Sequence, residues 1–200
     1  MDILSLQPGD PRYPATLQAF EQVAAIGSPL LLQHKKLALF CSRRCPGGLI
    51  LKAHEWAQGL CQEGLVVVSG FHTPVEQECL RLFLRNEQPV ILCPARSIEG
   101  MRIPSAYRQP LHEGRLLILS PFAPAYRRAT QKQAATRNEM VVQLADVLFV
   151  VHAASGSGTA HLGQDAMRAG KAVFTLDHSD NAHLLEAGVE PVTRATWRTL

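Results

Sequence analysis

Six short apolar runs punctuate this chain, and each one ends in small, polar or basic residues. Most of these runs are rich in β-branched or large aliphatic side chains, which is typical of buried strands. Their apolarity is continuous rather than alternating, and this favours parallel strands that are covered on both faces. The predicted strands are Leu37–Cys41, Leu65–Ser69, Pro89–Cys93, Arg115–Ser120, Asp146–Val151 and Ala172–Leu176.

The segments between and after these runs are long enough for helices. The predicted helices are Leu49–Glu63, Pro74–Asn86, Ser105–Glu113, Arg137–Ala145, Thr159–Ala169 and Asn181–Ala187. Regular alternation of strand and helix predicts an α/β protein with a doubly wound, mostly parallel sheet of six or more strands and helices on both faces. This is an extended Rossmann-like architecture.

The composition indicates one domain rather than two. Hydrophobic residues make up 46% of the 200 residues and charged residues 18%, which suits a single globular core. We expect residues 1–36 to be a lead-in packed on that core, with one short helix around Ala15–Ala24, and residues 37–200 to form the Rossmann-like domain. The N-terminus resembles neither a secretion signal nor a membrane span, so we expect a cytoplasmic protein without a membrane partner.

The cysteines favour reduced thiols. Five are present, at positions 41, 45, 61, 79 and 93, and no two of them form a C-x-x-C pair. An odd number in a chain without a secretion signal argues against a disulfide framework. Three of them lie in or beside apolar runs, where cysteine behaves as a small hydrophobic residue.

The fifth apolar run leads into a glycine and serine loop that suits a phosphate group. Ser155-Gly156-Ser157-Gly158-Thr159 lets backbone N–H groups approach an anion, and a helix starting near Thr159 would point its free amides at the same place. The loop matches neither the dinucleotide fingerprint nor a P-loop. A nucleotide or a nucleic-acid phosphate is the expected ligand.

Other residues that suit anions follow the remaining strands. Ligands of open parallel sheets bind at the carboxyl ends of the strands, so these segments are expected to share one rim. Arginine forks suit phosphate oxygens, and hydroxyl groups and glycine amides can assist them. The candidate phosphate-binding residues outside the glycine loop are Ser42, Arg43, Arg44, Ser69, Gly70, Arg102, Arg108, Arg137 and Asn138. Aromatic residues at the rim, such as Tyr107 and Tyr126, are candidates to stack a base.

The sequence contains no strong catalytic or metal-binding pattern. Neither a nucleophile elbow nor an H-E-x-x-H motif is present, and Glu76, Glu78 and Glu99 are scattered as on solvated helix faces. We therefore predict no catalytic residue, no metal and no cofactor.

The order of these motifs resembles the DprA/Smf family of DNA-processing proteins, from about Tyr13 to Val192. Phe40-Cys41-Ser42-Arg43 resembles the Val-Gly-Ser-Arg strand end of that family, and Val67 to Phe71 is similar to Val-Val-Ser-Gly-Leu. Arg137-Asn138-Glu139 falls where the family has Arg-Asn-Arg, and Ser155-Gly156-Ser157 matches Ser-Gly-Ser. Gly170 to Phe174 resembles Gly-Arg-x-Val-Phe.

The resemblance implies a homodimeric protein that binds single-stranded DNA through a basic pocket. It also implies a role in loading the RecA recombinase during natural transformation. The chain is then a divergent, stand-alone member that acts without catalysis. Arg43, Arg102, Arg108 and Arg137 would hold phosphates, while the glycine loop supplies amides.

A second interpretation stays open. The wider SLOG superfamily includes the LOG phosphoribohydrolases, which hydrolyse nucleoside monophosphates and carry the pattern Gly-Gly-x-Gly-Thr-x-x-Glu. Here Leu162 stands in place of the glutamate. This favours a nucleotide-binding sensor over a hydrolase within that alternative.

Overall fold

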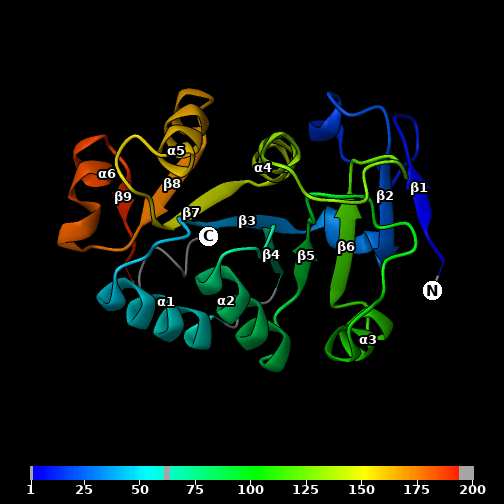
Figure 1. Cartoon of the computed structure of the whole chain (residues 1–200), viewed down its shortest axis with the longest axis horizontal. Helices are drawn as coiled ribbons and strands as arrows, with labels where there is room; N and C mark the ends of the chain where they lie inside the picture. The colour runs from blue at the N-terminus through cyan, green and yellow to red at the C-terminus, as the bar shows by residue number, and fades with distance from the viewer. Residues whose placement is uncertain (1, 61–63, 194–200) are drawn as a thin grey trace.

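The computed structural model describes residues 2–60 and 64–193 and places its strands in one mixed sheet (Figure 1). Among these residues the sheet has nine strands in the order β1-β2-β6-β5-β4-β3-β7-β8-β9. The strands are Leu4–Leu6 (β1), Val23–Gly27 (β2), Lys35–Cys41 (β3), Leu65–Ser69 (β4), Val90–Leu92 (β5), Leu116–Ser120 (β6), Val147–His152 (β7), Ala172–Thr175 (β8) and Glu190–Pro191 (β9).

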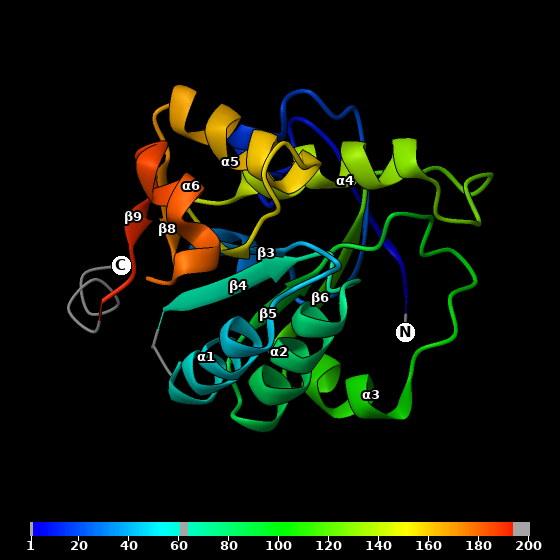
Figure 2. The same ribbon diagram turned by 60° about the vertical axis from the view of Figure 1, so that its left-hand side comes forward.

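Helices cover both faces of the sheet, with α1, α2 and α3 on one side and α4, α5 and α6 on the other (Figures 1 and 2). The α-helices are Gly47–Gly59 (α1), Pro74–Arg85 (α2), Ser105–His112 (α3), Gln131–Leu144 (α4), Gly158–Arg168 (α5) and Ala182–Glu186 (α6). Short 3-10 helices are Ala15–Leu17 (η1), Pro29–Gln33 (η2) and Ser179–Asn181 (η3).

The predicted doubly wound α/β fold is confirmed. From β3 the chain runs outward through β4, β5 and β6, then returns to the other side of β3 and continues through β7 and β8. These six strands pair in parallel, and β3 and β7 are neighbours in register from Leu37↔Val147. The reversal of winding direction between β3 and β7 marks the crevice where such sheets bind ligands.

The buried strands alternate between two cores. Leu37 and Leu39 of β3 point into the core under α1, α2 and α3, whereas Ala38 and Phe40 point into the core under α4, α5 and α6. Each fully buried leucine removes apolar surface from water and contributes about 2 kcal/mol. Burial on both sides explains why the sequence shows continuous apolar runs in these strands.

The predicted helix around Ala15–Ala24 is wrong. Only Ala15–Leu17 is helical, as η1, and Val23–Gly27 forms β2, which pairs antiparallel with β6. The side chains of β2 alternate between the two cores, with Val23 and Ala25 in one and Ile26 in the other. This alternation is the signature of a strand, and tertiary pairing with β6 decides the outcome.

Two of the predicted helices differ at their starts by two residues or more. α4 starts at Gln131 instead of Arg137, because Thr130 and Gln133 form a capping box in which each side chain accepts a hydrogen bond from the other residue's N–H. α1 starts at Gly47 instead of Leu49 and ends at Gly59. The last part of the predicted helix Leu49–Glu63 lies outside the described residues, as does Cys61.

No helix within residues 2–60 and 64–193 has the length and apolarity that a membrane span needs.

We predict that Gly27→Ala destabilises the protein through the β2–β6 pairing. Gly27 has φ +106°, and an added Cβ would lie 2.4 Å from the Leu116 carbonyl oxygen. Strain and overlap together should lower the free energy of unfolding by about 3 kcal/mol. Gly9→Ala is the matched control, because Gly9 has φ +98° with no atom within 4 Å of an added Cβ. Urea unfolding should show a clearly larger loss for Gly27→Ala; equal losses would contradict this packing.

Candidate functional site

The loops that follow β3 and β7 meet at the crevice between these strands. The Ser42 N–H donates to the His152 carbonyl (2.8 Å), and the Ala154 N–H donates to Ser42 Oγ (3.2 Å). The hydroxyl of Ser42 is therefore joined to the backbone at the start of the glycine loop. The structure thus brings these two predicted site segments together.

The glycine loop leads directly into α5. Ser157 caps this helix, since its Oγ accepts from the Ala160 N–H at 3.2 Å. Ser155, Gly156 and Gly158 are exposed, and a Cβ added at either glycine would meet no atom within 4 Å. The loop is therefore open to solvent. The N–H groups of the first turn of a helix have no acceptor within the helix, and the N-terminus of a helix favours an anion.

Two exposed cations, Arg43 and Arg44, directly follow Ser42 in the sequence. They lie in the turn between β3 and α1. Thr159 is half-buried in the first turn of α5. The arrangement offers two guanidinium groups, a hydroxyl and helix amides at one end of the sheet.

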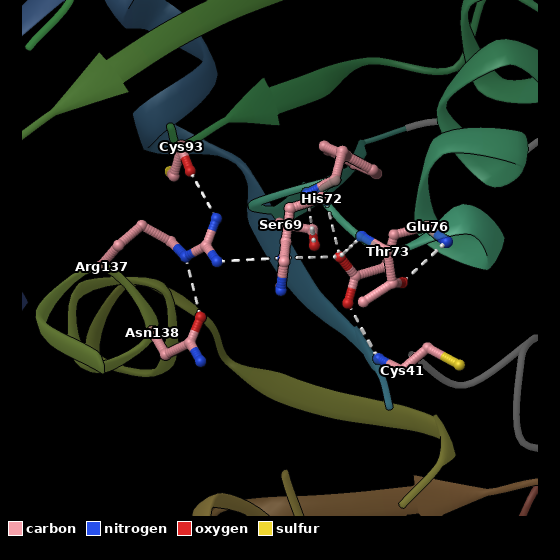
Figure 3. Close-up of polar contacts among 9 residues, drawn as sticks. Cys41, Ser69, His72, Thr73, Glu76, Cys93, Arg137 and Asn138 are labelled. Atoms are coloured by element: carbon pink, nitrogen blue, oxygen red, sulfur yellow. Dashed lines mark hydrogen bonds and ion pairs between the residues drawn. The ribbon is translucent and has the colours of Figure 1, made fainter. Parts of the chain in front are cut away.

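Arg137 occupies a different position from the one predicted. Its side chain is only 1% exposed, in the middle of α4 rather than at its start. Nη1 donates to the Cys93 carbonyl at the end of β5 (2.9 Å), and Nε donates to Asn138 Oδ1 (2.8 Å), as Figure 3 shows. Nη2 lies 3.1 Å from His72 Nδ1. All three guanidinium nitrogens thus have partners within the protein.

Gly70 is required by this buried guanidinium. A Cβ added at Gly70 would lie 1.4 Å from Arg137 Nη1 and 2.0 Å from Cζ. No side chain fits between the end of β4 and α4. Gly70 therefore packs directly against the Arg137 guanidinium, and both Ser69 and Gly70 are buried.

The prediction that Glu76 lies on a solvated helix face is wrong. Glu76 is 1% exposed, and its carboxylate accepts from the Cys41 N–H (2.9 Å) and the His72 N–H (2.9 Å). Glu76 also forms a capping box with Thr73 at the start of α2. The sequence signal for this role was present as Thr73-Pro74-Val75-Glu76, the capping-box pattern.

His72 lies between the buried cation and the buried anion. Its Nδ1 is 3.1 Å from Arg137 Nη2 and 3.1 Å from Glu76 Oε2, while nearly half of its side chain is exposed (Figure 3). Burial lowers the pKa of Arg137, and the charge of Glu76 opposes that shift. Arg137 contacts Cys93 and His72, and Glu76 contacts His72 and Cys41. These contacts connect α4 with the ends of β5, β4 and β3.

The backbone is strained beside this network. Phe71 has φ +46°, which is uncommon for a bulky residue, and its N–H donates to Ser69 Oγ (3.2 Å). Phe71 is buried in the core under α1, α2 and α3. Strain of this kind persists only where the surroundings enforce it.

Two predicted phosphate ligands lie away from the crevice. Arg102 is exposed on the segment between β5 and α3, and Arg108 lies on α3. Arg108 lines a mostly apolar cavity of about 820 Å³ beside Ile26 of β2 and Ile98. Because β5, β4 and β3 separate β6 from β7, the structure does not place Arg108 with the glycine loop.

No group of three or more histidine, cysteine, aspartate or glutamate side chains suited to a metal ion is found in the described part of the chain.

The fold and the crevice define a Rossmann-like protein whose rim suits anions, and comparison with known families is more specific. The family model of DNA recombination-mediator protein A matches residues 5–194. This span is nearly the whole chain, so the chain belongs to that family.

Solved structures of DNA processing protein A (DprA) show the same fold. The Streptococcus pneumoniae structure superposes with a TM-score of 0.82 and 23% identity, covering 100% of this chain and 74% of that one. The Helicobacter pylori structure gives a TM-score of 0.77 and 21% identity, covering 100% and 95%. A molybdenum cofactor binding protein from Rippkaea orientalis is more distant, with a TM-score of 0.57, 14% identity and coverage of 83% and 93%. No curated protein sequence matches this chain.

We predict that Gly70→Ala disrupts the Arg137 network. The new methyl group must displace a buried guanidinium from its partners, which should cost about 3 kcal/mol of unfolding free energy. Gly158→Ala is the matched control, because an added Cβ there meets no atom within 4 Å. Thermal and urea unfolding measure the difference. A Gly70→Ala protein as stable as Gly158→Ala would show that Arg137 does not occupy this place.

Proposed function

We propose that this protein binds single-stranded DNA at the carboxyl end of its sheet, in the crevice between β3 and β7. The observation that carries the proposal is the contact of Ser42 with Ala154, which joins the arginine turn to the glycine loop. The related protein of Helicobacter pylori is described as binding single-stranded DNA. Membership of the DNA recombination-mediator protein A family supports the same role.

The exposed groups at the crevice suit phosphates better than bases. Arg43 and Arg44 supply charge and hydrogen bonds, and the first amides of α5 add neutral donors. Arg137 has a different task in this proposal. With its nitrogens engaged by Cys93, Asn138 and His72, it positions the strand ends and leaves phosphate contact to the exposed arginines.

Tyr126 offers a surface on which a base of a longer strand can stack, at a distance from the crevice because β5, β4 and β3 separate β6 from β7. It is 52% exposed on the segment after β6, next to the exposed Arg127 and Arg128. Phe122 supports it with a ring-centroid distance of 6.0 Å. Base stacking on aromatic rings is sequence-tolerant, which suits a protein that handles single strands of any sequence.

In the cell the protein would act as an accessory to recombination. We propose a non-catalytic homodimer that loads the RecA recombinase on single-stranded DNA during natural transformation. Family membership and the exposed basic turn support this role. The competing candidate is a nucleotide sensor, whose site would be the same glycine loop, and a competition experiment separates the two.

Binding of a fluorescein-labelled oligo-dT, measured by fluorescence anisotropy at low salt, tests the proposal. We expect saturable binding that weakens as salt is added, because phosphate neutralisation releases counterions. AMP should compete poorly. Tight AMP binding without oligonucleotide binding would replace the DNA proposal with the nucleotide sensor.

Arg43→Ala should weaken oligo-dT binding about tenfold, which corresponds to about 1.4 kcal/mol. The matched control is Arg81→Ala, which removes an exposed arginine from α2, where it pairs with Glu78. Both variants change the net charge equally. Equal affinities for the two variants would remove Arg43 from the binding site.

A further inference from the structure

Three cysteines gather beside the turn that carries Arg43 and Arg44. Cys41 and Cys79 are buried in the core under α1, α2 and α3, and Cys45 packs against the same core while half-buried. All three are free thiols. Only Cys45 among them is partly open to solvent, so it is the member of the cluster that a small reagent can reach.

Cys41 and Cys45 lie close together in the chain. Cys41 is the last residue of β3, and Cys45 precedes Pro46, the N-cap of α1. Only Ser42, Arg43 and Arg44 separate the two cysteines, and Cys45 packs against the core in which Cys41 is buried. The Cys45 thiol donates a hydrogen bond to the Pro46 carbonyl (3.8 Å). The Cys41 backbone is fixed from the other side, because its N–H donates to Glu76.

The two thiols have opposite electrostatic environments. Interaction with the Cys41 thiol lowers the pKa of Cys45, although burial and the charge of Asp180 oppose that shift. The adjacent N-terminus of α1 also favours a thiolate. For Cys41, the same interaction, burial and the charge of Glu76 raise the pKa. Both directions favour Cys45 over Cys41 as the thiol that loses its proton first.

We propose that Cys45 is a site of oxidation by peroxides and that Cys41 resolves the oxidised form as a disulfide. The Cys45 thiolate attacks one oxygen of hydrogen peroxide, the O–O bond breaks, and the departing hydroxide takes a proton to become water. Cys45 is then a sulfenic acid. The Cys41 sulfur attacks Cys45 Sγ, the S–O bond breaks, and the hydroxide leaves as water with the Cys41 proton. In total, two thiols and one peroxide yield one disulfide and two waters.

The disulfide closes a small ring around Ser42, Arg43 and Arg44. In the function proposed above, this turn contacts DNA phosphates, and the coupling to DNA rests on that proposal. A bound phosphate chain places negative charge beside Cys45 and covers the turn. Bound DNA is therefore expected to slow the oxidation of Cys45 several-fold.

Peptide mapping tests the chemistry without DNA. A Cys61→Ser background removes the thiol that lies outside the described residues. After limited hydrogen peroxide and alkylation, trypsin cuts after Arg43 and Arg44, so a Cys41–Cys45 disulfide appears as two linked peptides. We expect this link to form first, Cys45→Ser to abolish it, and Cys41→Ala to leave a sulfenic acid on Cys45 that dimedone traps.

Cys93 provides the internal control, since it is fully buried and burial raises its pKa to about 12. Cys45 should react with iodoacetamide at least tenfold faster than Cys93. Equal rates, a link from Cys45 to Cys79, or no link at all would overturn the proposal. If oxidation proceeds as described but saturating oligo-dT does not slow it, the thiol chemistry stands and the coupling to DNA fails.

Discussion

A buried guanidinium fixes the end of the sheet at which ligands would bind. Arg137 reaches from α4 to the carbonyl of Cys93 at the end of β5 and to His72 after β4. His72 in turn contacts Glu76, whose carboxylate accepts a hydrogen bond from the Cys41 N–H at the end of β3. A charge with so little exposure is costly unless its partners are complete, so each strand end is held at a defined place.

This network explains three features: the glycine at position 70, the burial of Glu76 and the location of the strained Phe71 backbone. Gly70 is glycine because Arg137 occupies the space of a side chain, and Glu76 is buried because two strand ends need its carboxylate. The strained backbone of Phe71 lies between them. With β3 and β4 fixed, the turn of Arg43 and the glycine loop after β7 come together through Ser42. The charge of Arg137, which positions the strand ends, is buried, whereas the charges of Arg43 and Arg44 are exposed and available to a ligand.

The sequence predicted the core of the fold because strands buried on both faces leave continuous apolar runs. The start of β2 was predicted as the end of a helix because the antiparallel pairing of β2 with β1 and β6 is set by tertiary contacts. For the candidate site, the structure confirms only that the segments after β3 and β7 meet. The position after each strand predicted that Ser42 and the glycine loop lie together. Burial is not readable from residue type, so Arg137 and Glu76 were both expected at the surface, whereas both are buried.

Arg102 and Arg108 show the same limit. Their place after β5 suggested the rim, but the long segment before α3 carries Arg108 to the cavity beside β2. Strand order, which cannot be read from a single sequence, separates them from the glycine loop.

In the proposed binding mode, Arg137 positions the site from within while Arg43 contacts phosphate. The slope of log affinity for oligo-dT against log salt concentration tests it directly, in wild type, Arg43→Ala and Arg137→Gln. Each lost phosphate contact lowers the slope by roughly 0.7 for a single strand. We predict that Arg43→Ala lowers the slope by this amount, whereas Arg137→Gln weakens binding with the slope unchanged. A lower slope for Arg137→Gln, with no change for Arg43→Ala, would contradict the account.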